Sequence, residues 1–578
     1  MDLLLAHGDD GSPILDHATD PSTAAATANP AARRTERFLA DITANADDLT
    51  HQGWAVVATD DAEGARLEAL VRELIAVRAE EQGAEVLSIR VPPGMDSAAA
   101  NQWKASVYPT LYGEDETRRP RYLLILGDLD RVSIDTQHVL SQDGIAGRLA
   151  CLTEDGYAVY ADKVLAWQRA PSQQDRARAL FYTVRDGSSA TTAGHSKLIL
   201  PCHDRCVRAA RDKPRTFPAS AVESHGAESP DPDELLRLVA ARHPSVLLSV
   251  SHGMGPPRRR RWSPAEAREL QGAMSFGAEG ALEVRDLASA PFLPGGLWIY
   301  FACFGAGTPR TSAYHHWLQM LADQGMTELG PVHETLRGLD EGGGFVSGLG
   351  KAALANPNGP LALLSHIDLA WSYSYEELRV GGDHDARRVS GSNRSLNFFQ
   401  LISKLMSGSR AGAASLALKL RLGAVSAELN AHYDRCKRAG GVEGGPDELL
   451  ALGNLWMLHQ DLLGFALLGD PAVRLPLAPP DAGAPAAETP AASGTATLGP
   501  GAAGGETRAA IAVDPDELDR LERAALAVAG GDSPGVVAAQ VGIARSEIVE
   551  AADAYRDAGR AALSELLARR EPEKGRGE

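Results

Sequence analysis

The stretch LWIYFACFGAG, at Leu297–Gly307, decides the fold of this chain. Its first six residues are bulky or apolar, a pattern typical of a strand buried on both faces of a parallel sheet. The run ends at Cys303 and breaks at once into Gly305 and Gly307. Because open α/β sheets place their chemistry at the carboxyl ends of the strands, a thiol at this position is a candidate catalytic group.

A second run of the same design lies upstream. Residues 246–250 read VLLSV, and Ser251, His252 and Gly253 follow directly. His252 precedes Cys303 by 51 residues, which is enough for a helical crossover between two parallel strands. We therefore expect His252 and Cys303 to lie at the same edge of one sheet.

Further apolar runs alternate with helical patterns on both sides of these two strands. Strand patterns are found at 54–58, 85–89, 121–127, 177–184, 197–200, 361–366 and 465–468. Strands that alternate with helices predict an α/β fold with a doubly wound, mainly parallel sheet.

Composition divides the 578 residues into five predicted parts. A chain of this length exceeds one ordinary core. The parts are a flexible N-terminus at 1–32, an N-terminal α/β subdomain at 33–232, a second α/β subdomain at 233–477 that carries both motifs, an Ala/Gly/Pro-rich linker at 478–508, and a small all-α module at 509–572.

The all-α module resembles a helix-turn-helix. Its long helix holds three Arg against four Asp or Glu within residues 544–560. A helix without net positive charge is a poor reader of DNA. The favoured role is therefore the recruitment of a protein partner, and a DNA-linked regulator is the alternative.

Charge and cysteine content restrict the class of protein. The formal net charge of −19 argues against affinity for nucleic acids or anionic membranes, since both need a cationic surface. No apolar run approaches the roughly 18 residues of a membrane-spanning helix, and the N-terminus does not read as a secretory signal. Five cysteines do not make a disulfide framework. We expect a cytoplasmic protein with Cys303 as a free thiol.

The two motifs together resemble a known family. SHG after one hydrophobic strand, and AC followed by small residues after another, are similar to the caspase-like (clan CD) cysteine peptidases of the gingipain/CHAT-domain type. RYLLILGDLDRVS at Arg121–Ser133 and FALLGDPAVRL at Phe465–Leu475 resemble the gingipain side. The resemblance implies a caspase-like sheet in two subdomains and a cysteine endopeptidase in bacterial defence or signalling.

Peptide hydrolysis by a thiol needs a nucleophile, a proton carrier and donors for the oxyanion. Cys303 is the candidate nucleophile and His252 the candidate general acid/base. The resemblance implies that the backbone N–H groups of Gly253 and Cys303 form the oxyanion hole. The alternative is an inert buried cysteine beside a polar strand end, in a catalytically silent CHAT-like binding scaffold.

Other motifs compete for these roles. Ser224–Gly226 repeats SHG but is predicted to be a loop, and His7-Gly8 lies too near the terminus for a central strand. His366 ends a good strand and is an alternative partner for Cys303. The cluster Cys202–Cys206 offers one group of ligands, whereas structural zinc normally takes two paired spacings. We therefore expect no metal and no cofactor.

The first specificity pocket is predicted from the resemblance. Gingipain-like enzymes that prefer basic side chains use an acidic residue upstream of the catalytic histidine. Asp204 has a comparable position, after the strand expected at 197–200, although an exposed loop aspartate is the alternative. Asp368 and Trp371 are further candidates for the pocket walls. These residues predict cleavage of a protein substrate after basic residues. The Arg258–Arg261 loop either gates the cleft, is itself a cleavage site or is a solvated basic loop.

Overall fold

The computed structural model describes residues 2–15, 17–20, 45–112, 119–170, 174–258, 260–337, 339, 343–376, 394–439 and 446–478. Residues 1–485 form one compact unit and residues 486–578 a second. The predicted linker and all-α module lie, from residue 479 on, outside the described residues and stay predictions. No helix in the described ranges is long and apolar enough to cross a membrane.

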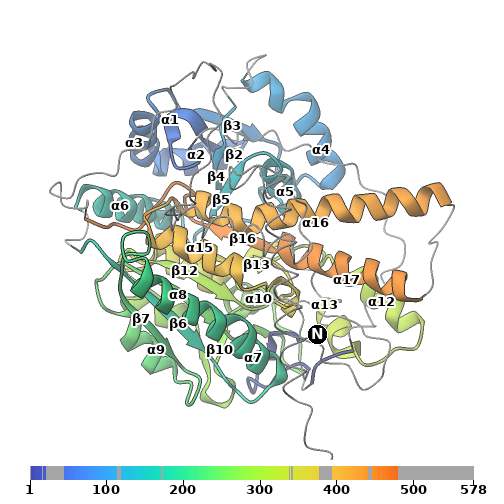
Figure 1. Cartoon of the computed structure of the whole chain (residues 1–578). Coiled ribbons are helices and arrows are strands. Elements are labelled where there is room, and N and C mark those ends of the chain that lie inside the picture. The colour runs from blue at the N-terminus through green and yellow to red at the C-terminus, as the bar shows by residue number, and fades with distance from the viewer. Residues whose placement is uncertain are drawn as a thin grey trace, which may run out of the picture. The chain divides into compact units, whose positions relative to one another are not determined.

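A ten-stranded sheet organises the first unit (Figure 1). Its order is β3-β2-β4-β5-β16-β15-β12-β8-β6-β7. The strands are β2 (Trp54–Thr59), β3 (Leu87–Val91), β4 (Tyr122–Leu126), β5 (Ile145–Leu149), β6 (Ala177–Thr183), β7 (Ala219–His225), β8 (Ser245–Val250), β12 (Leu297–Phe301), β15 (Ala362–His366) and β16 (Phe465–Leu468). Neighbouring strands are parallel throughout, except that β15 and β16 are antiparallel.

Both faces of this sheet are covered. In β2, Trp54 and Val56 belong to the main hydrophobic core, whereas Ala55 and Val57 belong to a second core. That second core includes Trp103 from α4. Successive strand residues point to opposite faces, so each face packs against its own layer. The predicted α/β fold with a doubly wound, mainly parallel sheet is confirmed.

Several helices begin at a side chain that caps them. Ser188 caps α7 and Asp231 caps α9, and a Ser263–Glu266 capping box starts α10. The helices are α1 (Leu49–Gln52), α2 (Ala62–Leu70), α3 (Arg72–Gln82), α4 (Ser97–Ser106), α5 (Ile134–Ser141), α6 (Asp155–Arg169), α7 (Ser189–Ala193), α8 (Leu200–Asp212), α9 (Pro232–Val239), α10 (Pro264–Leu270), α11 (Val284–Ser289), α12 (His315–Asp323), α13 (Gly330–Leu336), α14 (Gly348–Ala355), α15 (Leu396–Met406), α16 (Ala411–Ala439) and α17 (Pro446–Leu463).

The strands of the predicted 33–232 subdomain do not stay together. β2 to β5 form one end of the sheet, but β6 and β7 lie at the other end, where β6 pairs with β8 (Figure 1). The strands of residues 33–232 thus occupy both ends of one sheet, and the subdomain boundary at residue 232 stays a prediction. The sequence order does not predict this arrangement, because β16, from the far end of the chain, is inserted between β5 and β15.

Two local predictions are wrong. Residues Lys197–Leu200 are not a strand, because Gly194–Ile199 forms a π-helical turn that continues directly into α8. Ser224 and His225 are not a loop but the end of β7, at the edge of the sheet. The residues of β7 are only partly buried or exposed, so its polar composition conceals an edge strand.

A small sheet lies against this framework. Its order is β1-β9-β10-β11, with β1 at Leu5–His7, β9 at His252–Gly255, β10 at Met274–Ser275 and β11 at Ala281–Leu282. The expectation of a loose N-terminus is wrong for residues 2–15, since Leu3, Leu4 and Leu5 are buried. Their apolar side chains supply the burial that a loose segment lacks. Residues 21–44 lie outside the described residues.

Candidate active site

The register of the central strands brings His252 and Cys303 to the same level. β8 and β12 are parallel neighbours in which Val250 is paired with Phe301. Each candidate residue lies two positions beyond that pair. Both therefore emerge at the carboxyl edge of the sheet, where open α/β folds carry their sites.

Gly253 is held directly against the cysteine backbone. A Cβ atom on this glycine would lie 1.8 Å from the Cys303 carbonyl oxygen, so no other residue fits here without a backbone shift. The N–H of Gly253 and the N–H of Cys303 both donate to the Leu4 carbonyl oxygen, at 2.6 and 3.2 Å. Two convergent backbone donors are the arrangement that stabilises an oxyanion.

One edge of the His252 ring is held by a polar pair. Its Nε2 lies 3.0 Å from the Ser188 hydroxyl and 3.4 Å from Asp186 Oδ2. Asp186 Oδ1 accepts hydrogen bonds from the Ser188 backbone N–H and hydroxyl and from the Thr191 hydroxyl. These contacts fix the orientation of the ring, as a carboxylate behind a functional histidine does.

The other edge of the ring is free to take part in chemistry. Among the described residues, the buried Nδ1 of His252 has no hydrogen-bond partner. Burial lowers the pKa of His252, and the charges of Asp186 and Asp2 oppose that change. A neutral ring with its proton on Nε2 presents a lone pair at Nδ1, which is the state that a proton acceptor needs.

Cys303 is a free thiol that is completely buried. Its Sγ accepts a hydrogen bond from the Ala370 N–H at 3.2 Å. Burial raises the pKa of the Cys303 thiol, and hydrogen bonds from the Ala370 and Leu4 backbones only partly offset this. Burial thus disfavours the thiolate, the form in which a cysteine acts as a nucleophile.

Backbone strain lies next to the thiol. Phe304 and Asp368 have positive φ values of 58° and 94°, a conformation that L-residues rarely adopt. They are joined by a hydrogen bond from the Phe304 N–H to the Asp368 carbonyl at 2.8 Å. Strained residues of this kind persist only where their surroundings hold them, and they concentrate at functional sites.

The three candidate pocket residues have different surroundings. Asp204 lies on α8 with its side chain 67% exposed and beside His203. The Asp368 carboxylate is buried and accepts from the Ser312 hydroxyl and from the N–H groups of Ala313 and Leu369. Burial raises its pKa to about 6.

Trp371 is the candidate that meets the segment beside Cys303. It is buried and forms an antiparallel bridge with Leu3. Leu4 follows directly and reaches the two N–H donors, so Trp371 contacts the same N-terminal segment that lies against Cys303.

Sequence reasoning missed three functional candidates. Asp186 and Ser188 follow β6, and no local pattern links them to a histidine 64 or more residues away. Asp461 of α17 accepts from the N–H groups of Trp371 and Ser374 and from the Ser374 hydroxyl. It thereby holds the Trp371–Ser374 segment from a helix 90 residues further along the chain.

His366 and the cysteine cluster have other partners. The Nε2 of His366 lies 3.0 Å from the Asp461 carbonyl oxygen, and its ring packs 4.0 Å from that of Phe465. Cys202 donates to the Ser395 carbonyl oxygen from a buried position. Within the described ranges, no three His, Cys, Asp or Glu side chains are grouped to hold a metal ion.

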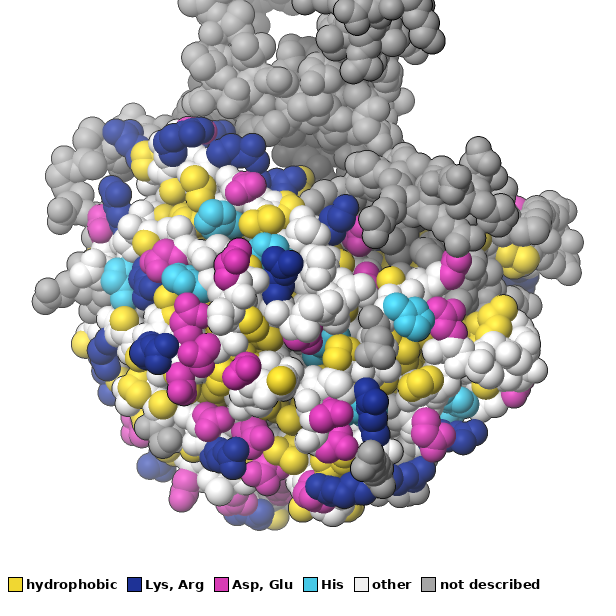
Figure 2. Space-filling model, turned by 90° about the horizontal axis from the view of Figure 1, so that it is seen from below, with side chains coloured by type: hydrophobic (Ala, Val, Ile, Leu, Met, Phe, Trp, Pro, Cys, Tyr) yellow, Lys and Arg dark blue, Asp and Glu magenta, His cyan; other side chains and the backbone are white. Residues whose placement is uncertain are grey.

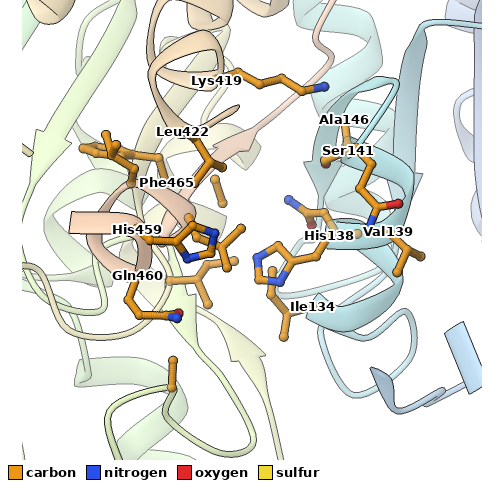
Figure 3. Close-up of a pocket in the computed structure, with 18 of the residues that line it drawn as sticks. Ile134, His138, Val139, Ser141, Ala146, Lys419, Leu422, His459, Gln460 and Phe465 are labelled. Atoms are coloured by element: carbon orange, nitrogen blue, oxygen red, sulfur yellow. The ribbon is translucent and has the colours of Figure 1, made fainter. Parts of the chain in front are cut away.

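A cavity of about 680 Å³ lies elsewhere, between α5, α16 and α17 (Figure 3). His138 and His459 face each other across it, and Lys419 lies at its rim (Figure 3). Of the described residues, neither His252 nor Cys303 lines it. Asp368 is the one of the predicted site residues that does line it.

No protein-family model and no curated protein matches the chain. Among solved structures it is similar to the Arg-specific cysteine proteinase gingipain R, with 12% identity and a TM-score of 0.39 over 74% of this chain and 78% of that one. A structure described as a protease has 13% identity and a TM-score of 0.41 over 73% and 78%. The Saccharomyces cerevisiae separase–securin complex has 9% identity and a TM-score of 0.26 over 60% and 15%. We therefore infer function from the geometry of this chain alone.

Proposed function

We propose that this protein is a cysteine endopeptidase of the caspase-like, gingipain/CHAT type. The observation that carries the proposal is the pair of N–H groups, from Gly253 and Cys303, that meets one amide oxygen beside the thiol. The Asp186–Ser188–His252 arrangement supplies an oriented proton carrier at the same sheet edge. A substrate peptide takes the place of the Leu4 amide.

In the first step His252 takes the proton of the Cys303 thiol, and the thiolate attacks the carbonyl carbon of the scissile peptide bond. The electrons of the C=O double bond move to oxygen, and this oxyanion is bound by the two backbone N–H groups. Collapse of the tetrahedral species breaks the C–N bond. His252 returns the proton to the departing amine, and a thioester remains on Cys303.

In the second step water replaces the amine. Neutral His252 takes a proton from the water, which attacks the thioester carbonyl at the same oxyanion site. The C–S bond breaks, the carboxylic acid leaves, and the proton returns to sulfur. Asp186 and Ser188 act only as positioning residues, since they contact the imidazole ring and not the reacting carbonyl.

The cysteines and the charge of the chain favour a reducing cytoplasm as its location and a protein as its substrate. All five cysteines are free, which suits a reducing cytoplasm. The face in Figure 2 mixes acidic and basic side chains, and the net charge is −19, so a protein substrate is preferred to nucleic acid. The predicted module at 509–572 would recruit a protein partner, in bacterial defence or signalling.

The test is covalent labelling of the full chain with peptidyl acyloxymethyl ketones that carry different first-position residues. Mass spectrometry of the digest should find the adduct on Cys303, and His252→Ala should slow its formation strongly. Cys151→Ala, which removes a different thiol, is the matched control and should leave labelling unchanged. Equal labelling of His252→Ala and the parent would contradict the proposal, and a silent scaffold would then be favoured.

A further inference from the structure

The N-terminal segment runs through the candidate active site. Leu3 forms an antiparallel bridge with Trp371 on one wall. Leu4 then places its carbonyl oxygen on the N–H groups of Gly253 and Cys303. Strand β1 continues along the other wall, where Leu5 is paired in parallel with Gly253. The chain thus enters on the Trp371 side and leaves along β9.

This course has the features of a bound substrate. Peptides commonly bind by adding a strand to an exposed sheet edge, with main-chain hydrogen bonds for affinity and side-chain pockets for specificity. β1 is an added edge strand of this kind, since it lies at the end of the sheet β1-β9-β10-β11. The residue at the two oxyanion donors is then the first-position residue, here Leu4, and the bond placed for attack is Leu4–Leu5.

The segment is anchored beyond the cleft by its own return strand. The Ile14 N–H donates to the Leu5 carbonyl at 2.9 Å, and the His7 N–H donates to the Ser12 carbonyl at 2.8 Å. At the turn, Gly11 has φ +66° and lies so close to Gly277 that a Cβ would meet its carbonyl oxygen at 2.2 Å. Both strands of this hairpin therefore fit against the body of the protein.

The segment also closes the site. The side chains of His252 and Cys303 are both 0% exposed, although a peptidase must admit a peptide between them. The Leu4 carbonyl already uses both donors that the reaction needs. A substrate can enter only when this part of the chain leaves.

We propose that residues 2–15, here called the N-terminal strap, are a built-in substrate-like inhibitor, and that the subsite filled by Leu4 selects leucine-type apolar side chains. The proposal rests on the proposed peptidase function. The sequence resemblance predicts cleavage after basic residues. The position of Leu4 in this structure instead favours cleavage after leucine.

The surroundings of Leu4 support an apolar subsite. Its side chain is 0% exposed and belongs to the main hydrophobic core. A lysine or arginine placed there would lose its hydration and would need a buried carboxylate as partner. Asp204 is exposed on α8, and Asp368 already accepts three hydrogen bonds.

The test opens the strap and measures how fast Cys303 reacts. Ala6→Pro removes a ladder N–H from the middle of β1, and thermal melts check that the body stays folded. We expect a leucine-type acyloxymethyl ketone to label Cys303 at least about tenfold faster in Ala6→Pro than in the parent, since the rate follows the open fraction. A synthetic peptide of residues 2–15 should slow this labelling again.

Each alternative result has a definite meaning. If the parent is labelled as fast as Ala6→Pro, the proposal that the N-terminal strap inhibits the site is overturned, whereas the peptidase proposal is unaffected. Faster labelling of the opened variant by an arginine-type probe would overturn the leucine subsite. If neither probe labels Ala6→Pro while iodoacetamide alkylates its Cys303, the peptidase proposal fails and this inference fails with it.

A second variant covers the case in which Ala6→Pro does not fold. Leu4→Arg should expel the strap from an apolar subsite and speed labelling by the leucine-type probe. Leu152→Arg makes the same change at a leucine that is 51% exposed and should leave the rate unchanged. If Leu4→Arg is labelled as slowly as Leu152→Arg, the subsite accepts a basic side chain and the inference is overturned.

Discussion

Two histidines flank the cysteine strand, and they differ in their level relative to Cys303. β8 and β15 lie on either side of β12, and each leads to a histidine. His366 is the last residue of β15, and continuing the strand register places it level with Phe301. His252 lies beyond the end of β8 and is level with Cys303. His252 thus lies two residues further along the strand direction than His366, so that His366 is inside the sheet and His252 is at its edge.

The partners of the two rings follow from this shift. His366 packs between the rings of Phe301 and Phe465, at 4.9 and 4.0 Å. His252 has Ser188 and Asp186 on one nitrogen. The comparison shows that a histidine at a strand end is not by itself a catalytic candidate. His366 also has an aspartate at its Nε2, since Asp461 Oδ1 and the Asp461 carbonyl oxygen lie 3.3 and 3.0 Å away. The level of each ring relative to Cys303 is therefore what separates the two candidates.

The largest difference is expected when each histidine is removed. With the strap opened by Ala6→Pro, His252→Ala should lower peptide cleavage by about 10²-fold or more, because the leaving amine loses its proton donor. His366→Phe retains an aromatic ring in its packed position and should leave the rate of the folded protein within a few-fold. Cys303→Ala should abolish cleavage. Comparable losses from His252→Ala and His366→Phe would break the comparison.

Substitution of Asp186, which lies behind the His252 ring, should show whether this carboxylate positions the ring for catalysis or only supports the structure. Asp186→Asn should lower kcat by about tenfold or more, since it weakens the orientation and charge stabilisation of the His252 ring. The pH dependence of kcat should change with it, which a purely structural role would not cause. Asp186→Glu retains the carboxylate and should recover part of the rate. An unchanged pH profile in Asp186→Asn would exclude this positioning role.

Asp461 should matter for stability and for the shape of the cleft wall. Asp461→Ala leaves the buried N–H groups of Trp371 and Ser374 without their acceptor, at a cost of about 1–3 kcal/mol for each unsatisfied group. Denaturant unfolding should show the loss. Asp434 is exposed on α16, so Asp434→Ala is a control that should change the free energy of unfolding little.

The smallest effect concerns pH. Burial lowers the pKa of His252 below its ordinary value of 6.5, so the unfolded chain binds this proton more readily than the folded one. The corresponding stability is present above pH about 6.5 and is lost as the pH falls below it. His252→Gln should therefore show a shallower decline than the parent in melts from about pH 7.5 to 5. Identical slopes would mean that this ring does not resist protonation.

Local patterns in the sequence were sufficient to find the central strands and the two residues at their ends. Runs such as Val246–Val250 and Leu297–Ala302 are apolar because both sheet faces are buried, and burial leaves a direct record in composition. His252, Gly253 and Cys303 could be placed because each follows such a run. Alternation of strands and helices predicted the fold class for the same reason.

Only the tertiary structure decided which distant segments complete the site. Asp186 lies 3.4 Å from the ring of a histidine 66 positions away, and Asp461 accepts a hydrogen bond from an N–H 90 positions away. No local pattern records a pairing of that kind. The three leucines at 3–5 predict that this segment is buried, but they do not predict which part of the molecule it packs against. Their position beside Cys303 comes from parallel pairing with β9, about 248 residues along the chain. Packing between remote segments, which sequence periodicity cannot report, determined the burial of His252 and Cys303.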